Sequence, residues 1–187
     1  MSKKGLRYVA FGIRNDTTGT FSGGKHLSPA AALSGSANTS DVKDYGDDRV
    51  VETDKSVTGG TLTVELNHDE DEIYTMLLGH SKSENLISHN VDDVAPFVGV
   101  GCVGQSGSKW TAKIYTKVQF AEPADENNTK EESVQFNHVT LEGDILIPED
   151  GIWKLRQTFD TFALAKAWID EKLSVTTTTP ANPANPG

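Results

Sequence analysis

The chain has 187 residues and a formal net charge of -10, which is enough length for one domain with a hydrophobic core. So acidic a chain repels nucleic acid and anionic membranes, and therefore lacks the basic surface of a protein that reads nucleic acid. The single cysteine, Cys102, excludes an internal disulfide framework and fits a protein made in a reducing cytoplasm. We recognise no signal peptide in the sequence, and no apolar run of about 20 residues that could cross a bilayer.

Alternation of apolar and polar residues is the strongest pattern in the chain and predicts strands over 9–13, 62–66 and 110–120. In the last of these, one predicted face is apolar and buried and carries Trp110, Ala112, Ile114, Thr116, Val118 and Phe120. The other predicted face is exposed and carries Lys113, Tyr115, Lys117 and Gln119. Further strands are expected over 96–103, 134–147 and 152–159.

Two helices are expected between these strands. The first covers 69–79, where Asp69 and Glu72 have the spacing of a capping box and Gly79 suits the left-handed residue after a helix. The second covers 160–173, where apolar residues recur every three or four positions. Each helix would pack one face on a sheet, so the predicted fold class is mainly β with flanking helices, a β-sandwich or barrel-like domain over 1–173.

A polar segment over 38–60 has few apolar residues, and we expect it to be a long loop that orders only on assembly. From Asn38 to Glu72 there are 11 acidic and 3 basic residues, a net charge of -8. Its candidate functional residues are Asp41, Asp44, Tyr45, Asp47, Asp48, Arg49, Glu52, Asp54 and Lys55. Beyond Leu173, residues 174–187 are rich in threonine and proline and predict a flexible tail.

Motifs for nucleotide binding, serine hydrolysis and paired-cysteine chemistry are missing from the sequence, which predicts no enzyme, no cofactor and no metal. A hydrolytic zinc site built from His68, His80 and His89 with a carboxylate is one hypothesis, but the spacing of the histidines matches no compact ligand motif and favours surface histidines. The acidic run 69–72 suits a hard cation less well than it suits helix capping. Three tryptophans are more consistent with core packing than with a stacking platform for bases or sugars, namely Trp110, Trp153 and Trp168.

Several segments, taken in order, resemble the major tail protein family of long-tailed phages that infect Gram-positive bacteria. They are Leu33-Ser34-Gly35-Ser36, the turn Asp44-Tyr45-Gly46-Asp47-Asp48, the strand Gly59 to Leu66, the run Thr129-Lys130-Glu131-Glu132-Ser133-Val134, the strand Val139-Thr140-Leu141, and Ile152-Trp153-Lys154 before the last helix. Together they cover most of the chain from Leu6 to Leu173.

The resemblance implies a structural subunit of the phage tail tube, which forms stacked hexameric rings around a channel for DNA. It further implies a virion protein assembled in the host cytoplasm, with tape measure and tail-terminator proteins as partners. DNA would pass without specific binding, and the acidic segment would line the channel or stack the rings; it is equally consistent with a solvated face. Two alternatives remain: a monomeric ligand-binding β-sandwich module, for carbohydrate for example, and a small metallohydrolase.

Overall fold

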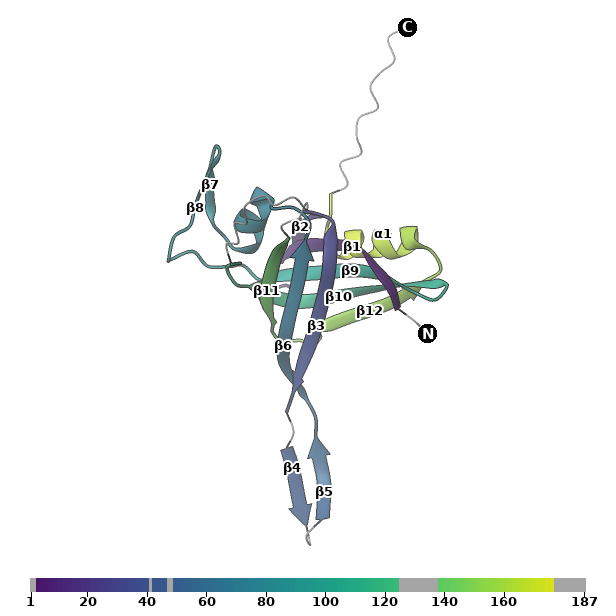
Figure 1. Ribbon diagram of the computed structural model, residues 1–187. Coiled ribbons are helices and arrows are strands. Elements are labelled where there is room, and N and C mark those ends of the chain that lie inside the picture. The colour runs from purple at the N-terminus through teal and green to yellow at the C-terminus, as the bar shows by residue number, and fades with distance from the viewer. Residues whose placement is uncertain (1–2, 41, 47–48, 125–137, 177–187) are drawn as a thin grey trace, which may run out of the picture.

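The computed structural model describes residues 3–40, 42–46, 49–124 and 138–176 (Figure 1). The protein is mainly β, with 52% of its residues in strands and 12% in helices, which confirms the predicted fold class. The elements in chain order are β1 (Lys3–Arg14), β2 (Phe21–Lys25), β3 (Ala30–Thr39), β4 (Val42–Gly46), β5 (Arg49–Asp54), β6 (Val57–Leu66), the π-helical turn η1 (Ile73–Leu77), β7 (Ser81–Ser83), β8 (Leu86–Ser88), β9 (Val98–Ser106), β10 (Lys109–Phe120), β11 (Val139–Ile145), β12 (Lys154–Phe159) and α1 (Phe162–Lys172). Within the described ranges, no helix is long and apolar enough to span a bilayer.

An antiparallel sheet of eight strands forms the body of the molecule, in the order β2-β1-β9-β10-β11-β6-β3, with β12 also paired to β10. Strand β10 has two partners along one edge, because β12 pairs with Trp110–Tyr115 and β11 pairs with Val118–Phe120. In Figure 1, β3, β6 and β11 cross β9, β10 and β12 at a steep angle, so one sheet supplies two layers. This is the sandwich or barrel-like arrangement that the alternating pattern predicts.

Two apolar clusters lie on opposite faces of the sheet. The inner core lies between the layers, and its fully buried members include Val9, Phe11, Leu62, Val64, Leu66, Val98, Val100, Val118 and Leu141. The helix core lies between the sheet and α1, and contains Tyr8, Ala10, Val103, Ala112, Ile114, Ala165, Ile169 and Leu173. Strand β1 contributes alternate residues to both clusters, so it is buried on both faces.

The prediction that β10 has one apolar face and one exposed face is wrong. Ala112 and Ile114 belong to the helix core, whereas Val118 and Phe120 belong to the inner core. The pairing with β9 shifts register between Tyr115 and Val118, and an extra residue at such a bulge moves the following side chains to the other face. Tyr115, expected on the exposed face, is therefore buried in the inner core.

Glycines in β9 explain where α1 packs. Val98, Val100 and Cys102 point into the inner core, while Gly99 and Gly101 alternate with them and lie beneath the helix. A Cβ atom at Gly101 would stand 2.7 Å from Cγ2 of Ile169, so only a residue without a side chain leaves α1 this close. The helix begins as predicted in this region, and its N-cap Thr161 accepts a hydrogen bond from the N–H of Leu164 at 3.4 Å.

The first predicted helix is shorter than expected. It consists of the five-residue turn η1, whose N-cap is Glu72 and which no side chain caps, so the predicted capping box is wrong. Its buried residues Ile73, Met76 and Leu77 fasten it to the inner core, and tertiary packing thus replaces the missing cap. Gly79 has φ of 77°, the left-handed conformation that the sequence predicts after the helix.

The start of the predicted flexible tail is fixed to the sheet. The N–H of Gly24 donates to the carbonyl of Ser174 at 3.1 Å, and Val175 forms a parallel bridge with the same glycine. Ser174 Oγ also donates to the carbonyl of Phe21 at 2.9 Å. The folded domain therefore extends past Leu173, the boundary expected from the sequence. Residues 177–187, and the run 129–134 that contributes to the family resemblance, lie outside the described residues.

Candidate functional site

Strands, and not a loop, form most of the segment 38–60. β3 pairs with β6 along its length, from Ala30 opposite Leu66 to Thr39 opposite Val57, and β4 and β5 then continue the same hairpin outward. The segment between β3 and β6 forms the strands β4 and β5, which pair with each other. We call the part from Ser40 to Ser56 the hairpin arm.

Hydrogen bonds between Ser40 and Ser56 join the two strands of the arm at the point where it leaves the sheet. The N–H of Ser40 donates to the carbonyl of Ser56 at 2.9 Å, and their hydroxyl oxygens are 2.8 Å apart. Beyond this point, among the described strands, β4 and β5 pair only with each other. Strands of five and six residues add about 17–20 Å at about 3.3 Å per residue, and Figure 1 shows them projecting well clear of the body.

The register of the arm brings some of the predicted site residues together. Asp44 lies opposite Glu52, and Tyr45 lies opposite Val50. The other pairs are Val42 with Asp54, Lys43 with Thr53 and Gly46 with Arg49. Lys55 is exposed at the joint between β5 and β6, and Asp41, Asp47 and Asp48 lie outside the described residues. The register thus places two acidic residues at facing positions of the arm.

A second projection, which the sequence analysis did not single out, lies at the other end of the molecule. The small β7–β8 hairpin rises there, and β4–β5 extends from the opposite end (Figure 1). On and just after this hairpin, Leu86, Val91 and Val94 are 65%, 97% and 75% exposed. The signal available in the sequence was these apolar residues within a polar stretch, and exposed apolar side chains can contribute to an interaction surface.

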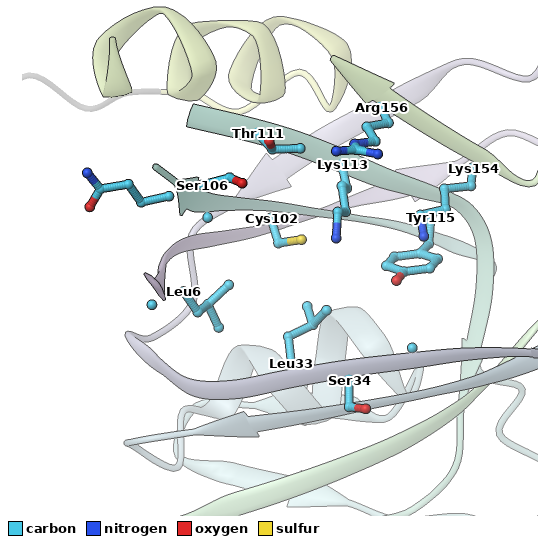
Figure 2. A pocket seen from close by; sticks show the side chains of 14 residues that line it. Leu6, Leu33, Ser34, Cys102, Ser106, Thr111, Lys113, Tyr115, Lys154 and Arg156 are labelled. Carbon is cyan, nitrogen blue, oxygen red and sulfur yellow. The ribbon is translucent and has the colours of Figure 1, made fainter. Parts of the chain in front are cut away.

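A cavity of about 550 Å³ opens between the two layers (Figure 2). Among the described residues, its lining includes three cationic residues, Lys113, Lys154 and Arg156, and no acidic one. Leu6 and Leu33 lie across the cavity from them, as Figure 2 shows, so the space is apolar on one side and cationic on the other. Lys113, expected on an exposed face, is thus half-buried and faces this cavity.

Cys102 also reaches the cavity but is poorly suited to act as a nucleophile. Burial raises the pKa of its thiol to about 11, because the thiolate would have to form in apolar surroundings. The nearby Lys113 and Lys154 oppose this shift but do not overcome it. At neutral pH the cysteine therefore stays protonated and behaves as a small buried hydrophobic residue.

The three tryptophans pack against the cores, as predicted. Trp110 meets Phe162 and Trp168 meets Phe159 at the helix core, with ring centroids 5.2 and 6.0 Å apart. Trp153 packs against the inner core. They therefore do not form one stacking platform.

The histidines are arranged differently from the zinc site considered above. His80 and His89 lie side by side, with ring centroids 4.1 Å apart, and Glu122 joins them. His68, the third residue of that hypothetical set, does not belong to this group. His80 is also not the surface residue expected, because its side chain is only 8% exposed.

No protein-family model matches this chain, and no curated protein matches its sequence.

Proposed function

We propose that this protein is the structural subunit of a phage tail tube, assembling through copies of itself into stacked hexameric rings around a channel that conducts DNA. The resemblance in sequence gives the particular assembly. The observation that carries the proposal is the hairpin arm, a long two-stranded projection whose size is hard to explain in a protein that works as a monomer.

The arm has the properties of an element that needs a neighbour. A two-stranded hairpin is marginally stable in water on its own, and β4 and β5 form such a hairpin. Its outer edges carry backbone N–H and C=O groups with no described partner strand. Such edges pair readily with another chain, so contact with an adjacent subunit would stabilise the arm and connect the subunits.

The two ends of the molecule favour a stacked assembly. The acidic hairpin arm extends from one end of the molecule, and the β7–β8 hairpin, which carries the exposed Leu86, projects at the other (Figure 1). Because these surfaces differ, contacts between successive subunits would be heterologous, and heterologous contacts can close into rings or continue along an axis. A strongly acidic chain also suits a channel wall, since it releases few counterions to DNA and therefore does not retain it.

Removal of the arm tests the proposal. Residues 40–56 are replaced by Asn-Gly, which joins the opposed residues Thr39 and Val57 through a tight hairpin turn. We expect the variant to keep the melting temperature of the parent, because the deletion removes none of the described residues that form the two cores. In negative-stain electron microscopy, the parent at high concentration should form rings or tubes of uniform diameter and the variant should not.

Two further variants sharpen the result. Val91→Asp changes a side chain that is 97% exposed, so it should leave the fold intact and impair stacking. Deletion of residues 177–187 serves as the control, with tubes expected as in the parent. A parent protein that stays monomeric at all concentrations, or an arm-deleted protein that still forms tubes, would contradict the proposal.

The cavity favours a second function, the binding of a small anionic ligand by a monomer. The observation in favour of this alternative is the cationic lining, in which the described residues include no acid. Inorganic pyrophosphate serves as the probe in a thermal-shift assay. A rise in melting temperature that Lys113→Gln abolishes, in a protein that forms no rings, would favour the monomeric binding module over the tube subunit.

A further inference from the structure

A compact group of metal-ligating side chains joins the β7–β8 region to the body of the protein. His80 follows η1, His89 follows β8, and Glu122 follows the end of β10. One potential ligand atom from each residue lies within 4.8 Å of the other two. Around a tetrahedral ion with bonds of about 2.0–2.2 Å, ligand atoms stand about 3.3 Å apart, so small side-chain rotations suffice to enclose an ion.

The orientation of His80 is already that of a metal ligand. Its Nδ1 is 2.7 Å from Oδ2 of Asp93, while its Nε2 faces Oε2 of Glu122 at 2.7 Å. Asp93 is itself held, because the same oxygen accepts the N–H of Asn90 at 2.9 Å. A carboxylate on Nδ1 fixes the tautomer that leaves the lone pair of Nε2 available, which is the usual arrangement of a zinc-binding histidine.

The side chains of the group differ in solvent exposure, as expected for a metal site with one coordination position open to water. The side chain of His80 is 8% exposed and that of Asp93 is 20% exposed, whereas those of His89 and Glu122 are 47% and 50% exposed. Nδ1 of His89 lies 2.8 Å from Oε1 of Glu122, so the two outer ligands also converge. An ion can enter from solvent and would keep at least one position for water.

We propose that His80, His89 and Glu122 bind one divalent transition-metal ion, with Asp93 as the residue that positions His80. Two imidazole nitrogens and one carboxylate suit Zn²⁺, whereas Mg²⁺ and Ca²⁺ prefer oxygen ligands. The bound ion would link the loop 80–93 to the end of β10, and thereby fix the projection that carries Leu86 and Val91. This inference concerns a single chain and holds whether or not the protein forms a tube.

A proton is the competing explanation for the same contacts. The hydrogen bond to Asp93 raises the pKa of His80, although desolvation opposes the shift, so an imidazolium could link Asp93 and Glu122 without a metal. The two explanations differ in what they expect from added zinc. Only the metal site binds the ion in a fixed ratio and loses that binding when one ligand is removed.

The test is calorimetric titration of ZnCl₂ into tag-free protein that has been freed of metal with EDTA. We expect one ion per chain, at least tenfold weaker binding for His89→Asn and Glu122→Gln, and a ten- to hundredfold loss for Asp93→Asn, as for other residues that orient a ligand. The matched control is His68→Asn, an exposed histidine outside the group, which should bind as the parent does. MgCl₂ should give no measurable binding.

Co²⁺ gives a second readout, because its visible absorption band is stronger in a site of low coordination number than in water. The band should appear with the parent and with His68→Asn, and should be lost with His89→Asn. Each variant's melting temperature in EDTA is measured first, and the exposed positions of His89 and Glu122 should keep it close to that of the parent. Absence of zinc binding by the parent, or equal binding by the parent and all ligand variants, would overturn the metal site.

Discussion

The packing of α1 on the glycines of β9 gives the sharpest prediction about stability. In Gly101→Ala the new Cβ would lie 2.7 Å from Cγ2 of Ile169 and 2.9 Å from Cδ1 of Leu173. Both distances are below any ordinary carbon contact, and the neighbours are fully buried side chains that cannot rotate into solvent. The helix must therefore move away from the sheet.

The loss of stability in Gly101→Ala has an upper limit, which is set by the two residues that would move away from the sheet. Complete exposure of Ile169 and Leu173 would cost about 1.5–3 kcal/mol each, which sets an upper limit of about 3–6 kcal/mol. An added methyl group in a packed core usually costs about 1–3 kcal/mol, because the neighbours relax only in part. We therefore expect Gly101→Ala to lower the free energy of unfolding by about 2 kcal/mol.

Urea unfolding followed by tryptophan fluorescence measures this change. With a slope of about 2 kcal/mol per molar urea, the midpoint should fall by about 1 M. The matched control is Gly104→Ala on the same strand, where the nearest atom to the new Cβ is 3.6 Å away. The control should keep the parent's stability or exceed it by about 0.4–1 kcal/mol, because alanine restricts the unfolded chain. Equal midpoints for the two variants would refute the close packing of α1.

Three other predictions concern the chain end, the cysteine and one surface carboxylate. Truncation after Thr176 should leave the melting temperature unchanged, whereas truncation after Leu173 should lower it by several degrees because the bonds to Gly24 are lost; equal values in calorimetry would contradict this. Cys102 should react with a thiol reagent far more slowly in the folded protein than in urea, because burial raises its pKa to about 11, and rapid labelling of the folded state would disprove its burial. The hydrogen bond to Lys117 lowers the pKa of Asp16, so its stabilising effect is present above the unfolded pKa of about 3.9 and is lost as the pH falls through the folded pKa. Asp16→Asn should thus be less stable than the parent at neutral pH and equal to it below the folded pKa, and urea midpoints that differ equally at both pH values would argue against this ion pair.

Local patterns predicted those parts of the fold that depend on neighbours in sequence. Leu62, Val64 and Leu66 alternate without interruption in a strand that has no register shift against β11, and all are buried as expected. The helix α1 follows from its periodic apolar residues, since Ala165 and Ile169 face the sheet. In both cases a single period describes the whole element.

The remainder depends on contacts between distant parts of the chain. The bulge between Tyr115 and Val118 arises where β10 changes partner from β12 to β11, which no pattern within β10 reveals. The few apolar residues of segment 38–60 predict a loop, but the pairing that begins at β3 and β6 continues into the strands β4 and β5. His80, His89 and Glu122 could not be grouped from the sequence, because the carboxylate lies far along the chain at the end of another strand.

The pairing of β1 with β9 has a consequence for how the protein reaches its native state. Val9 pairs with Cys102, so β1 can complete its pairing only after the distant strand β9 has been made, although its end from Phe11 to Arg14 also pairs with the nearby β2. The β3–β6 hairpin, by contrast, closes over a short separation. Because formation of long-range strand pairs slows folding, we expect β1 to join late. Until then residues 8–11, which become buried on both faces, are open to association with other nascent chains, and refolding yield should fall as protein concentration rises.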